Sequence, residues 1–288
     1  GIRDWSVTGV QTCALPILIA KMNEQADFPL RHDVLTEHQA RVARDYLARR
    51  AGERHHLVIY LSGAHAYGFP SPDSDLDLKS VHIARTSDLV GLVPRPGGAE
   101  VMLVEDGVEI DYGSNELGEV LRGVLKGNGN YLERLLGELV IEADVPRLLA
   151  LRPLVKATLS RRVVRHYGGF ASSQLKAAEV APTAKKVLYV LRTARTGYHL
   201  LRTGELVTDL NQLAAEYGPD ITDLKARKQS GERATLSSDE LGHWRGVLDR
   251  AIADMGGAVI TSVLPEEPTG ASITALEDWL KQTRKELW

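Results

Sequence analysis

The chain has 288 residues, 43% of them hydrophobic and 25% charged, and a formal net charge of −3. No stretch approaches the ~18 consecutive apolar residues that a membrane-spanning helix needs, so we expect no membrane partner and a cytoplasmic location.

The first residues require a separate interpretation. Residues 7–17 match the translation of a DNA sequence that resembles a common sequencing-library adaptor, so we interpret residues 1–17 as an adaptor artefact. An ordinary N-terminal extension is the alternative. The only cysteine, Cys13, lies in this stretch, which leaves the rest of the chain without a disulfide, a thiolate metal site or a cysteine nucleophile. About 270 residues remain, enough for two modest domains or one large one.

An N-terminal helical segment is expected over residues 18–52. Thr36 is a candidate N-cap for a helix over residues 37–50, and Gly52 ends the helical pattern. Residues 55–61 then form a β-rich apolar run, which predicts a buried strand.

The most informative stretch is 63–79, where a glycine-bounded turn precedes two carboxylates, Asp75 and Asp77. On a strand, residues i and i+2 point to the same face, so both aspartates can bind the same ions while Leu76 and Leu78 pack into the core. Carboxylate oxygens suit hard cations such as Mg²⁺ or Mn²⁺. The alternative is a solvated turn, because Pro-Asp-Ser-Asp is also a good turn sequence.

Further carboxylates follow in a predicted hairpin. Residues 101–104 and 108–112 are separated by an Asp-Gly pair, which is typical of a tight hairpin turn. A two-metal site for phosphoryl transfer holds its ions about 3.5–4 Å apart, and two aspartates alone bridge such a pair poorly. Glu109 and Asp111 share one face of the second strand and are the candidates for a third acid. The alternative is that both are simply exposed polar residues of the hairpin.

Beyond Ser114, apolar residues recur at helical spacing and predict mostly helices to the end of the chain. Asn128 and Asn130 are interpreted as helix-capping or turn residues. We expect the helices to be broken near five prolines: Pro146, Pro153, Pro182, Pro219 and Pro265.

A basic segment covers residues 151–202, where eleven lysines and arginines accompany a single acid, Glu179, so that it carries a net +10 and the rest of the chain −13. Such a local field attracts a triphosphate or an RNA backbone, although lysine and arginine side chains are often simply solvated. The candidates for phosphate or nucleic-acid contacts are Arg161, Arg165, Lys185, Lys186 and Arg192.

The stretch 63–79 resembles the signature of the DNA polymerase beta superfamily of nucleotidyltransferases, a Gly-Ser turn followed by an Asp-x-Asp strand. Four further segments are similar to a bacterial branch of predicted nucleotidyltransferases, itself similar to the polymerase-beta-type proteins associated with RNA repair: residues 125–133, 165–170, 198–204 and 264–268. The resemblance extends over residues 30–288.

This resemblance implies an α+β fold: a polymerase-beta-like mixed sheet with flanking helices, followed by an all-helical C-terminal domain. The nucleotidyltransferase catalytic domain would span residues 53–150, and the helical domain residues 151–288. The implied reaction is magnesium-dependent transfer of a nucleoside monophosphate from a nucleoside triphosphate to an acceptor hydroxyl, an RNA end being one candidate, with release of pyrophosphate.

The same resemblance implies roles for single residues. Asp75 and Asp77 would hold the metal ions, and the family's third acid corresponds better to Asp111 than to Glu109. Asp111 would then be the third metal ligand and the base for the acceptor hydroxyl. The implied nucleotide-binding residues are Ser62, Gly63, Ala64, Tyr67, Gly68 and Ser74.

The sequence departs from the family pattern at Ala64, where the family has a serine whose hydroxyl contacts the nucleotide phosphates. The backbone donors of the turn remain, and Ser62 and Ser74 offer other hydroxyls nearby. Two alternatives therefore stay open: a catalytically weakened homologue that binds nucleotide or RNA, and a transferase of the toxin–antitoxin type that acts on a protein.

Overall fold

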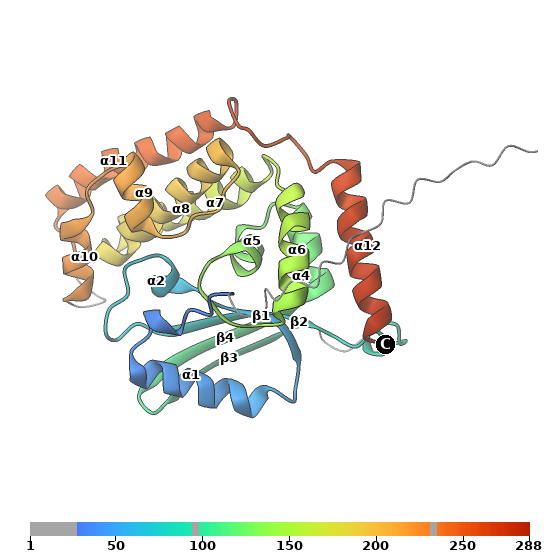
Figure 1. Cartoon of the computed structure of the whole chain (residues 1–288). Coiled ribbons are helices and arrows are strands. Elements are labelled where there is room, and N and C mark those ends of the chain that lie inside the picture. Colours follow the sequence, from blue (N-terminus) through green and yellow to red (C-terminus); the bar gives the residue numbers. More distant parts are fainter. Residues whose placement is uncertain (1–27, 94–97, 231–234) are drawn as a thin grey trace, which may run out of the picture.

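The computed structural model describes residues 28–93, 98–230 and 235–288. Its centre is a five-stranded sheet in the order β3-β4-β2-β1-β5 with helices on both faces (Figure 1). β2 and β4 are parallel and the other neighbouring strands antiparallel, so the sheet is mixed as expected. The strands are β1 (His55–Leu61), β2 (Leu76–Ile83), β3 (Ala99–Glu105), β4 (Val108–Glu116) and β5 (Val140–Ala143). The stretch interpreted as an adaptor, residues 1–17, lies outside the described residues, so that interpretation stays a prediction.

The first α-helix covers one face of the sheet (Figure 1). It is α1 (Glu37–Arg50), and Thr36 caps it in a capping box with Gln39. The apolar side of α1, including Tyr46, packs on the strand residues Ile59 and Leu76 in one hydrophobic cluster. The helix expected from the sequence is therefore present, after a short 3-10 helix (His32–Val34).

Short helices occupy the connections and the opposite face. They are α2 (Gly63–Ala66), α3 (Thr86–Leu89), α4 (Leu117–Leu125), α5 (Gly129–Leu136) and α6 (Val145–Ala157). Asn128 caps α5, its side chain accepting from the Asn130 N–H, as the capping interpretation expected. One expectation was wrong: α6 continues through Pro153. The carbonyl that loses its helical partner there belongs to Leu149, a residue that is 39% exposed.

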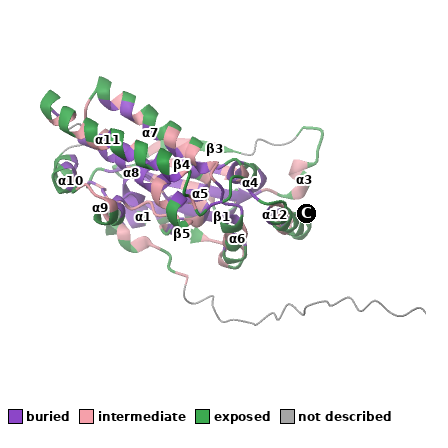
Figure 2. Cartoon of the chain, turned by 90° about the horizontal axis from the view of Figure 1, so that it is seen from above, coloured by how far each residue is buried: buried purple, intermediate pink, exposed green. Residues whose placement is uncertain are grey.

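The C-terminal region is helical, as expected. It comprises α7 (Val163–Val180), α8 (Ala184–Thr203), α9 (Leu210–Tyr217), α10 (Thr222–Gln229), α11 (Ser238–Ala258) and α12 (Gly270–Glu286). The central strands β1 and β2 and the inner sides of these helices are largely buried, whereas the edge strand β3 and the outer sides of α10, α11 and α12 are exposed or half-buried (Figure 2). In the described part of the chain no helix is both long and apolar enough to cross a bilayer.

Two hydrophobic clusters join the sheet to this helical region. One places Val58 and Val81 with Leu200 and Met255, and the other includes Tyr60 and several residues of α8. Both clusters therefore combine residues from the two sides of position 150, where the sequence placed a domain boundary.

Candidate active site

The parallel pairing of β2 with β4 brings two of the three expected carboxylates together. Asp77 and Asp111 are partners in that ladder, so their side chains lie side by side on one face of the sheet. Asp75 immediately precedes β2, and its charge acts on Asp77. Glu109 lies before the first pair of the β2–β4 ladder and is exposed.

The carboxylate of Asp77 is in an unfavourable electrostatic environment. Burial raises its pKa to about 6, the ammonium of Lys79 counteracts part of this, and the negative charges of Asp111 and Asp75 add to it. Burial is thus the main reason that the charged form of Asp77 is disfavoured.

Lys79 is the member of this cluster that the sequence reasoning missed. Its Nζ lies 2.6 Å from Asp111 Oδ1 and forms an ion pair that is partly exposed. A signal was present, because Lys79 follows Asp77 by two residues and so shares its face of the strand. The ion pair itself depends on β4 lying next to β2.

The turn before the aspartates packs directly on Asp77. Gly63 has φ +64, and a Cβ at this position would overlap Asp77 Oδ2. The Ser62 N–H donates to the Asp77 carbonyl at 2.8 Å. Ala64, where the family pattern has serine, is 6% exposed and belongs to the hydrophobic cluster of α8. Glycine is thus required at position 63 by both its backbone conformation and its close contact with the carboxylate.

Two other expected nucleotide contacts have structural partners. Ser74 is buried, and its Oγ accepts from the Ser71 N–H at 2.9 Å and from Lys228 Nζ at 2.8 Å. Lys228 belongs to α10, so this contact anchors the loop before β2 to the helical region. At Gly68, with φ +80, a Cβ would overlap the Asp209 carboxylate, so this glycine allows close packing on the start of α9.

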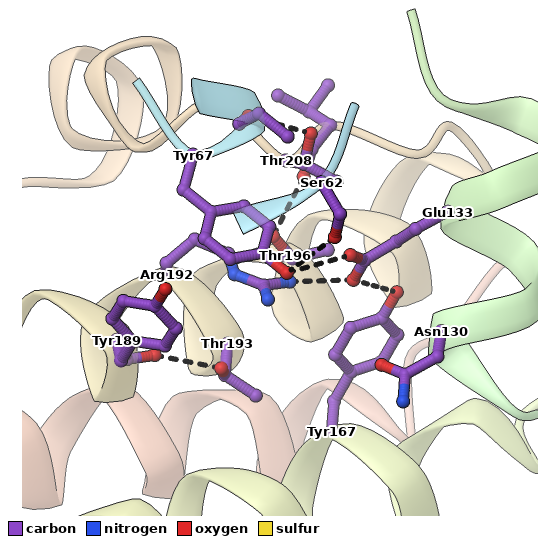
Figure 3. A network of polar contacts seen from close by, with 12 residues as sticks. Ser62, Tyr67, Asn130, Glu133, Tyr167, Tyr189, Arg192, Thr193, Thr196 and Thr208 are labelled. Carbon is purple, nitrogen blue, oxygen red and sulfur yellow. Dashed lines mark hydrogen bonds and ion pairs between the residues drawn. The ribbon is translucent and has the colours of Figure 1, made fainter. Parts of the chain in front are cut away.

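Tyr67 joins a buried network rather than facing solvent (Figure 3). Its hydroxyl lies 3.4 Å from Glu133 Oε2 and 3.5 Å from Ser62 Oγ. The guanidinium of Arg192 stacks 3.5 Å from the centre of the Tyr67 ring and donates from Nη1 to Glu133 Oε1 at 2.6 Å. The Tyr167 hydroxyl also donates to Glu133 Oε1, at 3.3 Å.

This network corrects one expectation for the basic segment. Arg192 is 3% exposed and does not offer its charge to an external phosphate. A buried guanidinium requires an equally buried partner, which Glu133 supplies from α5. The number of cations in a segment does not reveal which of them point inward.

The other four candidate cations differ in their surroundings. Arg161 donates from Nε to the Leu264 carbonyl at 3.0 Å, and Lys186 donates to two carbonyls at the end of α7. Arg165 is exposed. Lys185, at the start of α8, is half-buried and its charge lowers the pKa of Asp77, which places it within electrostatic reach of the carboxylates.

Comparison with known proteins identifies the family of this chain. The RNA repair pathway DNA polymerase beta family matches residues 40–282, and the chain belongs to that family. An uncharacterized protein of Methanocaldococcus jannaschii is 27% identical over 157 residues, which are 54% of this chain and 64% of that protein, so the match spans less than two thirds of the relative. A crystal structure of a nucleotidyltransferase-like protein from Exiguobacterium sibiricum aligns over 85% of this chain and 79% of its own, at 10% identity and a TM-score of 0.30, too low to support a conclusion.

Proposed function

We propose that this chain is a metal-dependent nucleotidyltransferase. It would transfer a nucleoside monophosphate from a nucleoside triphosphate to an acceptor hydroxyl, with an RNA end as the first acceptor to test. The observation that carries this proposal is the β2–β4 register, which sets Asp77 beside Asp111 next to the Gly63 turn. Membership of the RNA repair pathway family supports both the reaction and the acceptor class.

The carboxylates fit a divalent cation by their chemistry. In the described residues no group of three or more histidine, aspartate or glutamate side chains is already gathered as a metal site. However, Asp75, Asp77 and Asp111 supply the oxygen donors that Mg²⁺ and Mn²⁺ take, and the negative charges of Asp111 and Asp75 both act on Asp77. These three residues would hold the ion, which would stabilise the charge on the triphosphate and on the leaving pyrophosphate.

The protein's own groups would perform the remaining steps. Asp111 would accept the proton of the acceptor hydroxyl, whose oxygen then forms the new bond to the α-phosphorus. The bond from that phosphorus to the bridging oxygen breaks, and pyrophosphate leaves. Lys79 orients the Asp111 carboxylate through their ion pair, and Lys185 would add positive charge near the triphosphate.

Pyrophosphate release tests the proposal. The protein is incubated with each of the four ribonucleoside triphosphates, with Mg²⁺ or EDTA, and with RNA, protein or small-molecule acceptors. We expect Mg²⁺-dependent release that Asp77→Asn abolishes. Asp73→Asn is the matched control, because Asp73 is exposed in the same loop and carries the same chemical change. Equal turnover by Asp77→Asn and the parent would refute the mechanism.

A second candidate is a homologue that binds nucleotide or RNA without turnover. The specific observations that favour it are the buried Ala64 in place of a phosphate-binding serine and the existing ion pair between Lys79 and Asp111. It predicts triphosphate or RNA binding in the absence of pyrophosphate release from every acceptor. Release only with the protein acceptors would instead support a transferase that modifies proteins.

A further inference from the structure

A buried ionic network connects three helices to the turn in front of Asp77 (Figure 3). Glu133 comes from α5, Tyr167 from α7 and Arg192 from α8, and their exposed fractions are 2%, 0% and 3%. Tyr67, which ends α2, is 6% exposed. The network thus lies where the helical region meets the signature turn.

The charges of Arg192 and Glu133 are paired with each other inside the protein, whereas the Arg192 Nε is buried without a hydrogen-bond partner. Glu133 accepts from Arg192 Nη1 at 2.6 Å and from the hydroxyls of Tyr67 and Tyr167 at 3.4 and 3.3 Å. Arg192 also stacks on the Tyr67 ring. Replacing a buried ion pair by apolar residues of similar size is often neutral or stabilising, so stability alone does not account for these charges. What the pair does provide is a fixed position for Tyr67.

Tyr67 makes two contacts at the start of the signature turn. Its N–H donates to the Gly63 carbonyl at 3.1 Å, and its hydroxyl lies 3.5 Å from Ser62 Oγ. Ser62 is half-buried, and its own N–H donates to the Asp77 carbonyl. Ser62 is therefore the residue that links the network to the backbone of Asp77.

The arrangement of donors and acceptors in this network allows the Ser62 hydroxyl to donate a hydrogen bond to an anion. A tyrosine hydroxyl has one hydrogen, which Tyr67 can donate either to Glu133 or to Ser62 Oγ. When Tyr67 turns to Ser62, Glu133 Oε2 gives up this hydrogen bond, while Oε1 still accepts from Arg192 and Tyr167. Ser62 then keeps its own hydrogen for a phosphate oxygen beside Asp77.

We propose that Arg192 and Glu133 are positioning residues of the transferase, which hold Tyr67 so that it orients the Ser62 hydroxyl toward the triphosphate. This inference rests on the proposed function. It assigns triphosphate binding to Ser62 and gives the Arg192–Glu133 pair, which touches no substrate, a role in nucleotide affinity.

A double-mutant cycle on Ser62 and Tyr67 tests it. Tyr67→Phe keeps the ring on Arg192 and loses only the hydroxyl. We expect Ser62→Ala and Tyr67→Phe each to raise the Kd and KM for the magnesium–triphosphate complex about tenfold, the size of one hydrogen bond to a charged group. The double variant should lose no more than either single variant, and kcat should change less than KM. Tyr60→Phe is the matched control, because Tyr60 is a buried tyrosine whose hydroxyl meets Thr208 instead.

A second variant separates positioning from folding. Arg192→Met combined with Glu133→Leu removes both charges together, and we expect a Tm close to the parent's with the same rise in KM as Tyr67→Phe. Independent, additive effects of Ser62→Ala and Tyr67→Phe on Kd, or unchanged affinity in both, overturn the inference while the parent still releases pyrophosphate. A parent that neither binds nor turns over any triphosphate overturns the proposed function instead.

Discussion

At the scale of single residues, the i, i+2 spacing of Asp75 and Asp77 predicts a shared face, because alternation along a strand is a local property. The partners of these residues were not predictable in the same way. The contact of Lys79 with Asp111 requires two strands that are separated in sequence, and the burial of Arg192 requires a glutamate from another helix. Neither the composition nor a motif shows which side chains from distant segments will be in contact.

Asp77 provides a prediction about stability and pH. Burial raises its pKa to about 6 in the folded protein, above the unfolded value of about 3.9. Protonation of Asp77 therefore stabilises the folded protein. This stabilisation is complete below the unfolded pKa and is lost as the pH rises through about 6. We expect Asp77→Asn to raise the Tm of the metal-free protein at pH 7.5 by several degrees and to change it much less at pH 4.5. Equal shifts at both pH values in thermal denaturation would contradict this cause.

The third carboxylate can be identified by a matched pair of substitutions. Asp111→Asn should lower kcat for pyrophosphate release at least about a hundredfold, the usual contribution of a general base. Glu109→Gln should stay near the parent, because Glu109 is exposed before the start of the β2–β4 ladder. The reverse result would transfer the role to Glu109.

At the scale of elements, local signals predicted α1 and the β3–β4 hairpin. Asp106 and Gly107 have φ of +48 and +78, the positive values that a tight hairpin turn of this kind needs, and the ladder closes at Glu105 and Val108. The parallel pairing of β2 with β4 and the short strand β5 were not predicted. Each depends on a partner strand far along the chain, and β5 has only four residues to show a pattern.

The loop before β2 depends on one lysine of α10. Lys228 is 1% exposed and binds the hydroxyls of Ser71 and Ser74. Lys228→Met leaves both buried hydroxyls without this donor, so we expect a loss of about 1–3 kcal/mol in the free energy of unfolding, measured with urea. Lys176→Met, at an exposed position of α7, is the control and should change it little. A neutral effect of Lys228→Met would show that α10 does not anchor the loop.

At the scale of the whole molecule, the sheet and the helical region share their hydrophobic clusters. The family resemblance implied a catalytic domain over residues 53–150 and a helical domain over residues 151–288, where the basic segment begins. A change in charge composition along the chain does not imply that the hydrophobic core is divided at the same position. The helices α4, α5 and α6 lie directly on the strands, and the hydrophobic clusters continue from there into α8 and α11.

The shared clusters predict a single cooperative unit. Calorimetry of the full chain should show one unfolding transition whose calorimetric and van't Hoff enthalpies agree. A fragment of residues 28–150 should not fold alone, because its apolar surface toward α8 would be exposed to water. Two separate transitions, or a fragment with native near-ultraviolet circular dichroism, would support independent domains.

The contact between Gly63 and Asp77 limits how this protein can change over evolutionary time. The Asp77 carboxylate occupies the space that a side chain at position 63 would need. Shortening position 77 would free that space only by removing the carboxylate, and the positive φ of Gly63 would still strain any other residue there. We therefore expect Gly63 and Asp77 to be inherited together in descendants that retain the site.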